Sequence, residues 1–201
     1  VGVLELIDVH LGEGDAERTR AGLHGAAARA GAILAFGQDV SVHARYDQAR
    51  VVVSFEDDFL GGGPEQVRAA REFTKNRRVR GTTQEMNRLY VVESSPTPTG
   101  AMADHRLAKR SEDVGNVVRA LAAKLGVATS TPTKGLDPAT TRFVDALAKD
   151  LQSAGGASIV TCGPTQMPYV HALVHAFNTK LGAFGKAMRL LPPVECLPQD
   201  K

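Results

Sequence analysis

The segment Met86–Leu107 constrains the fold more than any other part of the chain. A short apolar run, Leu89 to Val92, ends at the acidic residue Glu93, and a loop rich in serine, proline and threonine follows. A short apolar run bounded by turn residues is typical of a buried strand in a parallel sheet. Open α/β folds bind their ligands beyond the carboxyl ends of such strands. We therefore expect this loop to lie at the ligand-binding edge of a sheet.

Two further segments repeat this arrangement. Val51–Phe55 runs into three acidic residues and then into Gly61–Pro64, and Ala157–Thr161 runs into Cys162-Gly163-Pro164. Helical periodicity, capping residues or a proline start predict helices from Glu65 to Asn76, from Ser111 to Leu125, from Asp137-Pro138 onward and from Pro168 onward. Strands that alternate with helices predict an α/β fold, a mostly parallel sheet with helices on both faces in a Rossmann-like three-layer sandwich.

The amino-terminal part predicts a strand at Val3–Val9 and a helix at Asp15–Arg29, followed by a short apolar run at Ile33–Phe36 that turns at Gly37. Residues 127–136 are rich in Thr, Pro and Gly and read as a connector. We expect residues 1–201 to form a single α/β domain. Because the chain begins at Val1 rather than Met, we expect it to be a piece of a longer subunit.

Charge and composition exclude several classes of partner. The net charge of +2 provides no strong field for nucleic acid or anionic lipid, so we expect no nucleic-acid partner. No apolar run reaches the roughly 18 residues that a membrane span needs, so no direct span is expected. The two cysteines, Cys162 and Cys196, are too far apart for a metal knuckle, and their spacing leaves a disulfide open.

Two groups of residues are candidates for nucleophilic or metal chemistry. His171 and His175 have the i, i+4 spacing of zinc-binding helices, but Ala172, Leu173 and Val174 stand where such sites place a glutamate, which favours solvent-side or interface histidines. Cys162 precedes a predicted helix, where a thiol can be activated. No histidine lies next to it in the sequence, which favours a buried structural cysteine. We predict no catalytic and no metal-binding residues.

Three other polar segments have simpler structural explanations. Gly61–Pro64 lies where a phosphate could meet helix N–H groups, but it matches neither glycine-rich phosphate motif, and Glu56, Asp57 and Asp58 would repel an anion. A tight turn is favoured there. The three acids suggest a hard-cation site or, more simply, a solvated strand end. The basic run Lys75–Arg80 indicates a solvated helix end rather than an anion site.

The segments Ala49–Pro64 and Met86–Leu107 resemble the molybdopterin-oxidoreductase superfamily. In that superfamily a strand leads into a V-V-D-P-R-x-T-x-T-A-x-x-A-D loop, and this chain has V-V-E-S-S-P-T-P-T-G-A-M-A-D at 91–104. The E-S form followed by T-G-A-M-A-D-H-R is most similar to the iron-sulfur subunit of bacterial alternative complex III, a quinol-oxidising respiratory complex. Gly31–Asp39 and Gly163–Gly185 support the same resemblance.

The resemblance implies a structural domain in a subunit whose redox centres lie elsewhere. The parent family carries iron-sulfur clusters, but this chain has no cluster-binding cysteine set, so we expect neither catalysis nor bound iron in it. The molybdopterin guanine dinucleotide of the superfamily is expected to be lost, because E-S-S replaces D-P-R and removes a bidentate phosphate donor. If a guanosine arm were retained, the matching cofactor-binding positions are Glu56, Asp57, Glu93, Ser94 and Ser95.

The same resemblance places the parent protein among the subunits of a membrane-associated respiratory complex. It implies an exported, peripheral protein on the periplasmic side of the bacterial inner membrane. Two alternatives stay open at this stage. One is the cofactor-binding domain of an active molybdenum oxidoreductase, and the other is an unrelated nucleotide-binding module.

Overall fold

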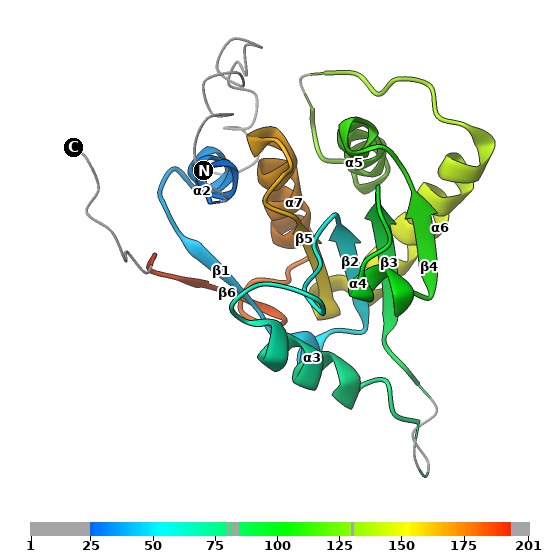
Figure 1. The fold of residues 1–201 in the computed structure, drawn as a ribbon. Coiled ribbons are helices and arrows are strands. Elements are labelled where there is room, and N and C mark those ends of the chain that lie inside the picture. The colour runs from blue at the N-terminus through cyan, green and yellow to red at the C-terminus, as the bar shows by residue number, and fades with distance from the viewer. Residues whose placement is uncertain (1–24, 80, 82–84, 130, 194–201) are drawn as a thin grey trace.

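The centre of the fold is a four-stranded, wholly parallel sheet (Figure 1). The computed structural model describes residues 25–79, 81, 85–129 and 131–193. The sheet has the order β4-β3-β2-β5. Its strands are β2 (Val51–Phe55), β3 (Arg88–Glu93), β4 (His105–Ala108) and β5 (Ser158–Cys162). The α/β class predicted from the alternation of strands and helices is confirmed.

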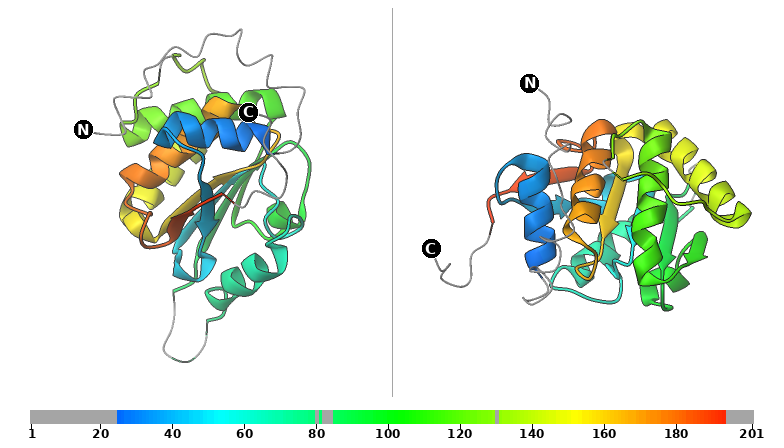
Figure 2. Two further views of the ribbon diagram at one scale, coloured as in Figure 1. Left: turned by 90° about the vertical axis from the view of Figure 1, so that its left-hand side faces the viewer. Right: turned by 90° about the horizontal axis from the view of Figure 1, so that it is seen from above.

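Helices cover both faces of this sheet, as Figure 2 shows in its left panel. Val53 and Phe55 of β2 point into one cluster with α5 (Ser111–Leu125), α6 (Pro138–Ala154) and α7 (Pro168–Lys180). Val52 points into a second cluster on the opposite face, where α3 (Gln66–Lys75) contributes Phe73. Every β2 residue is buried, which explains why this strand is a continuous apolar run rather than an alternating one. The result is the predicted three-layer sandwich.

A smaller antiparallel sheet and one helix lie beside the main sheet. β1 (Ser41–Ala44) pairs with β6 (Met188–Leu191), and α2 (Ala26–Phe36) packs along α7. The two helices approach closely at Gly31, where an added Cβ would lie 2.3 Å from the Cβ of His171. Glycine at 31 therefore sets the distance between α2 and α7.

The remaining described elements are the short helix α4 (Pro98–Ala101) and the 3-10 turns η3 (Tyr46–Gln48) and η4 (Gly155–Ala157).

Several predicted boundaries need correction. The apolar run Ile33–Phe36 is the last turn of α2, which Gly37 ends with a φ of 71°, so the helix predicted to stop at Arg29 continues past it. Pro64 does not occupy the first turn of α3, which begins two residues later. The loop after Glu93 was expected to be irregular and instead contains α4 and β4. The predicted strand Val3–Val9 and the start of the Asp15–Arg29 helix lie outside the described residues.

The helices on the first face follow the predictions closely. Asp137 caps α6, since its side chain accepts the N–H of Thr140, and Gly126 ends α5 with a φ of 66°. Ser111 was expected to cap α5, but the cap position belongs to Arg110 and the Ser111 hydroxyl donates to another residue. The segment 127–136 joins α5 to α6, and its described residues form neither helix nor strand.

Candidate functional site at the carboxyl edge of the sheet

The loops after β2, β3 and β5 meet at one edge of the sheet. The strand order reverses at β2, which lies between β3 and β5, and such a reversal is where open α/β sheets bind ligands. Phe55 pairs with Val92 and with Cys162, so the residues that follow these three strands are neighbours. The five predicted cofactor-binding positions follow β2 or lie at the end of β3, and all are at this edge. They are Glu56, Asp57, Glu93, Ser94 and Ser95.

The Glu56 carboxylate connects three separate segments at this edge. Its Oε1 accepts the backbone N–H of Ser94 at 3.1 Å, from the loop after β3. Its Oε2 accepts the Nε2–H of Gln166 at 2.7 Å, from the loop after β5, and the hydroxyl of Ser111 at the start of α5. Burial opposes ionisation, but the hydrogen bonds from Ser111, Ser94 and Gln166 outweigh it and lower the pKa of Glu56. Ser111 and Gln166 were not among the predicted site residues.

The backbone at Glu56 is held in an unusual conformation. Its φ of 55° lies in the left-handed region, which non-glycine residues rarely adopt. The Glu56 N–H donates to the carbonyl of Val92 at 2.8 Å, and the Glu56 carbonyl lies against Gly163. An added Cβ at Gly163 would lie 1.9 Å from that carbonyl oxygen, so only glycine fits there. The β2 and β5 loops are therefore in direct backbone contact.

Both carboxylate oxygens of Glu93 are bound by other residues of the domain. Glu93 is only 2% exposed, and its Oε1 forms an ion pair with Nε of Arg106 on β4. Its Oε2 accepts the hydroxyl of Thr97 at 2.7 Å, and the same hydroxyl caps α4 by accepting the N–H of Gly100. A Cβ at Gly100 would lie 1.8 Å from Oε1 of Glu93. The glutamate at the end of β3 therefore orders its own loop instead of facing outward.

Asp58 plays a corresponding role in the loop after β2. Its Oδ1 accepts the backbone N–H of Thr99 at 3.0 Å and the Thr99 hydroxyl at 2.7 Å, and that hydroxyl accepts the N–H of Leu60. The turn at Gly61 packs against this carboxylate, because an added Cβ would lie 2.1 Å from Oδ2 of Asp58. The glycine-rich segment is thus a tight turn, as predicted, and it packs around Asp58, whose carboxylate is hydrogen-bonded within the domain.

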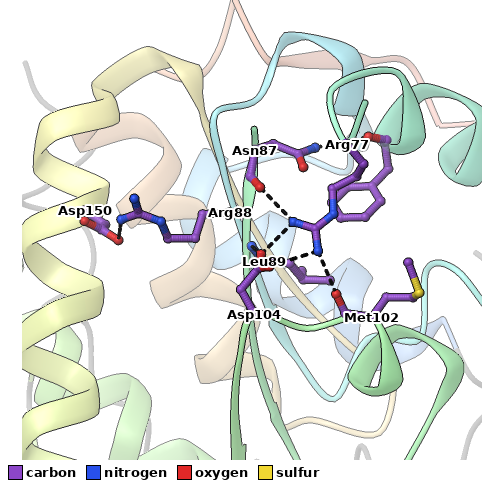
Figure 3. Close-up of polar contacts among 8 residues, drawn as sticks. Arg77, Asn87, Arg88, Leu89, Met102, Asp104 and Asp150 are labelled. Atoms are coloured by element: carbon purple, nitrogen blue, oxygen red, sulfur yellow. Dashed lines mark hydrogen bonds and ion pairs between the residues drawn. The ribbon is translucent and has the colours of Figure 1, made fainter. Parts of the chain in front are cut away.

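Arg77 and Asp104 tie the start of β3 to the end of α4 (Figure 3). The Arg77 guanidinium contacts both Asp104 oxygens, at 2.7 and 3.0 Å, and also donates to the carbonyls of Asn87 and Met102. Asp104 in turn accepts the N–H of Leu89 at 2.8 Å. Burial opposes ionisation of Asp104, but these hydrogen bonds lower its pKa. The prediction that Lys75–Arg80 is a solvated helix end is therefore wrong for Arg77, whose side chain is 15% exposed.

Asp57 faces β5 rather than β3. Burial raises the pKa of its carboxyl to about 6, a hydrogen bond from Thr161 lowers it in part, and the negative charge of Asp58 raises it. Its backbone N–H bonds the Ser54 hydroxyl at 3.0 Å. Burial and the nearby Asp57 charge raise the pKa of the Cys162 thiol. Asp57 and Glu56 are adjacent in sequence, but their carboxyl groups serve different neighbours.

A histidine reaches Cys162 in the fold, although none lies next to it in the sequence. Nδ1 of His171 is 3.0 Å from Sγ of Cys162, because the first turn of α7 returns over the end of β5. Of the two predicted settings for His171 and His175, a solvent-exposed face or an interface, the solvent-exposed one is wrong, since they are 4% and 9% exposed and face α2. Burial lowers the pKa of both imidazoles to about 4. The pKa shifts of Cys162 and His171 favour an uncharged thiol beside an uncharged imidazole.

The opposite edge of the sheet carries a polar groove that contains several ion pairs. Its lining includes Arg50 with Glu85, at 3.7 Å, and Arg88 with Asp150, an ion pair visible in Figure 3. The hydroxyl of Tyr90 also donates to Asp150 at 2.6 Å. These contacts lie at the amino ends of the strands, away from the edge that the resemblance singles out.

The described residues form neither a metal-ligand cluster nor a membrane-spanning helix. Among them, no three His, Cys, Asp or Glu side chains are arranged as ligands of one metal ion. No helix among them combines the length and apolar character of a membrane span.

Comparison with known proteins adds little to the site. No family model matches the chain, and no curated protein does. One solved structure that aligns with this chain is the formyltransferase/hydrolase complex from Methylorubrum extorquens in complex with methylofuran, at 16% identity and a TM-score of 0.49. The match covers 80% of this chain and 42% of that chain, so this chain spans less than half of that protein's length.

Proposed function

We propose that this chain is the α/β domain of a molybdopterin-oxidoreductase-like iron-sulfur subunit in a quinol-oxidising respiratory complex of the alternative complex III type. The domain serves as a scaffold and has no redox centre of its own. The parent protein is exported and peripheral, on the periplasmic side of the bacterial inner membrane, and associates with the other subunits of the complex.

The observation that carries this proposal is the closed network around Glu93. In a domain that holds a nucleotide arm, the acidic residue at the strand end is available to hydroxyl or amide donors of the ligand. Here Thr97 and Arg106 take both carboxylate oxygens, and Gly100 leaves just enough space for them. The most family-specific residues of the chain therefore stabilise the fold, which supports a structural role.

A second candidate function is binding of a guanine dinucleotide in an active molybdenum oxidoreductase. The exposed loop residues Ser94 and Ser95 favour it, because they stand at the reversal of strand order with side chains open to solvent. The same position also suits an unrelated nucleotide-binding module.

The full-length protein, purified with its complex, distinguishes these functions. We expect the complete reading frame to contain cysteine runs of the C-x₂-C-x₂-C-x₃-C type outside this chain, and quinol reduction to produce iron-sulfur signals in electron paramagnetic resonance. Substitution of those cysteines, and of none in this chain, abolishes the signals. Stoichiometric molybdenum in the purified protein would contradict the proposal and support the second candidate.

A further inference from the structure

We propose that the Glu56 carboxylate fills a binding site for a small phosphate or carboxylate ligand at the carboxyl edge of the sheet. By filling this site, the side chain of Glu56 excludes such ligands. We call the three groups that hold it the anion seat: the backbone N–H of Ser94, the hydroxyl of Ser111 and the side-chain amide of Gln166. The seat is formed by the loops after β3 and β5 and by the start of α5. It does not depend on which parent protein carries the domain.

The donors of the anion seat come from three elements and converge on one carboxylate. Ser94 follows β3, Ser111 opens α5 and Gln166 follows β5. Gln166 is 4% exposed, and its position is fixed because its backbone N–H bonds Gly163 at 3.1 Å and its Nε2 lies 3.2 Å from the Ser111 hydroxyl. Backbone and side-chain donors at the start of a helix are the groups that proteins use to hold phosphates and carboxylates.

Glu56 reaches the anion seat only by adopting an unfavourable backbone conformation. Glycine adopts a φ of 55° without strain, whereas a residue with a Cβ atom, such as Glu56, is strained there. The strained conformation directs an internal carboxylate onto the donors. Two further acids, Glu112 and Asp113, stand in the first turn of α5 with exposed side chains. Their charge limits the affinity for an external anion, so we expect millimolar binding once Glu56 is removed.

The variant Glu56→Gly tests the proposal because it removes the carboxylate and relieves the backbone strain together. In the full chain, phosphate at about ten times its dissociation constant is expected to raise the melting temperature of this variant by about 3 °C or more. Acetate is expected to act in the same way, since it replaces the missing carboxylate. Potassium chloride at equal ionic strength is not.

Two controls make the result specific to the anion seat. The wild-type chain and Glu112→Gln, which removes an exposed charge from the same helix turn, are expected to show no phosphate effect. Adding Ser111→Ala to Glu56→Gly removes one donor and is expected to weaken the phosphate response severalfold. An equal response in the wild-type chain, or none in Glu56→Gly, would overturn the proposal.

Loss of folding in Glu56→Gly is itself informative. If the variant does not melt cooperatively in plain buffer, recovery of cooperative melting in phosphate or acetate is the expected result. A variant that stays unfolded in both anions overturns the proposal. Either negative result leaves the proposed assignment to an iron-sulfur subunit unchanged, because that proposal rests on the sequence resemblance and on the network around Glu93.

Discussion

The buried histidine pair between α2 and α7 makes the stability of this domain depend on pH. The pKa of His171 and of His175 is lowered to about 4 from an ordinary value of 6.5. Nε2 of His171 and Nδ1 of His175 are buried without a hydrogen-bond partner, so protonation would place uncompensated charge in the helix interface. Between pH 6.5 and pH 4 the unfolded chain therefore binds more protons than the folded one, and stability falls as the pH falls.

The expected size of the effect follows from these shifts. From pH 7 to pH 5 each imidazole lowers the free energy of unfolding by about 2 kcal/mol. Asp57 acts in the opposite direction: its folded-state pKa of about 6 is raised, so protonation in this range stabilises the fold by about 1 kcal/mol. The carboxyl groups with lowered pKa values, such as Glu56 and Asp104, lose their contribution only at lower pH. The net loss is about 3 kcal/mol, or roughly 6–12 °C in melting temperature for a domain of this size.

The variant His175→Leu isolates one of the two imidazoles. Leucine preserves an apolar contact with Phe36, whose ring centroid lies 5.1 Å from that of His175. Thermal melting followed by circular dichroism at pH 7, 6 and 5 is expected to show about one third of the wild-type pH dependence, because one imidazole and the opposing effect of Asp57 remain. His43→Gln, on β1 and outside this interface, serves as the histidine control and is expected to keep the wild-type profile. Parallel profiles for the wild-type chain and His175→Leu would refute the reasoning.

Three substitutions test the network in the loop after β3, each by urea denaturation. Arg106→Met leaves the buried Glu93 charge unpaired and is expected to cost about 3–5 kcal/mol, most of which is recovered when Glu93→Gln is added. Gly100→Ala places a Cβ against the Glu93 carboxylate and is expected to cost about 1–3 kcal/mol. Arg77→Lys removes the two-pronged contact with Asp104 and is expected to cost about 2 kcal/mol.

An exposed ion pair provides the matched control for these variants. Lys124 and Asp145 lie 2.7 Å apart with about half of each side chain exposed. Lys124→Met is expected to change stability by less than about 1 kcal/mol. Equal losses in Lys124→Met and Arg106→Met would contradict the account of Glu93 as a buried, internally paired carboxylate.

The main elements of the fold were predictable from local patterns. Apolar runs that end in turn residues indicate buried strands such as Val51–Phe55. The Asp137 cap and the proline after it indicate the start of α6. β4 carries no such signal, because it is a four-residue edge strand whose side chains are mostly exposed. α4 is a single turn, too short for helical periodicity.

The contacts of the candidate site were less predictable, because they join residues far apart in the sequence. Glu56 meets Ser111 across 55 residues and Gln166 across 110 residues. The sequence correctly placed Glu56 at the carboxyl edge of the sheet but did not indicate which hydrogen-bond donors its carboxylate would meet. The contact between Cys162 and His171 spans only nine residues. A strand, a short turn and a helix that folds back over the strand end provide a signal that could have predicted it.

The central claim is that the carboxyl edge of this domain is occupied by its own side chains and holds no cofactor arm. The most direct test is acid release of nucleotides from the purified full-length protein, followed by absorbance and mass spectrometry, with calorimetric titration of the chain with guanosine diphosphate as a companion measurement. The account predicts less than stoichiometric traces of guanine nucleotide and no heat of binding. One guanine dinucleotide released per protein would contradict it.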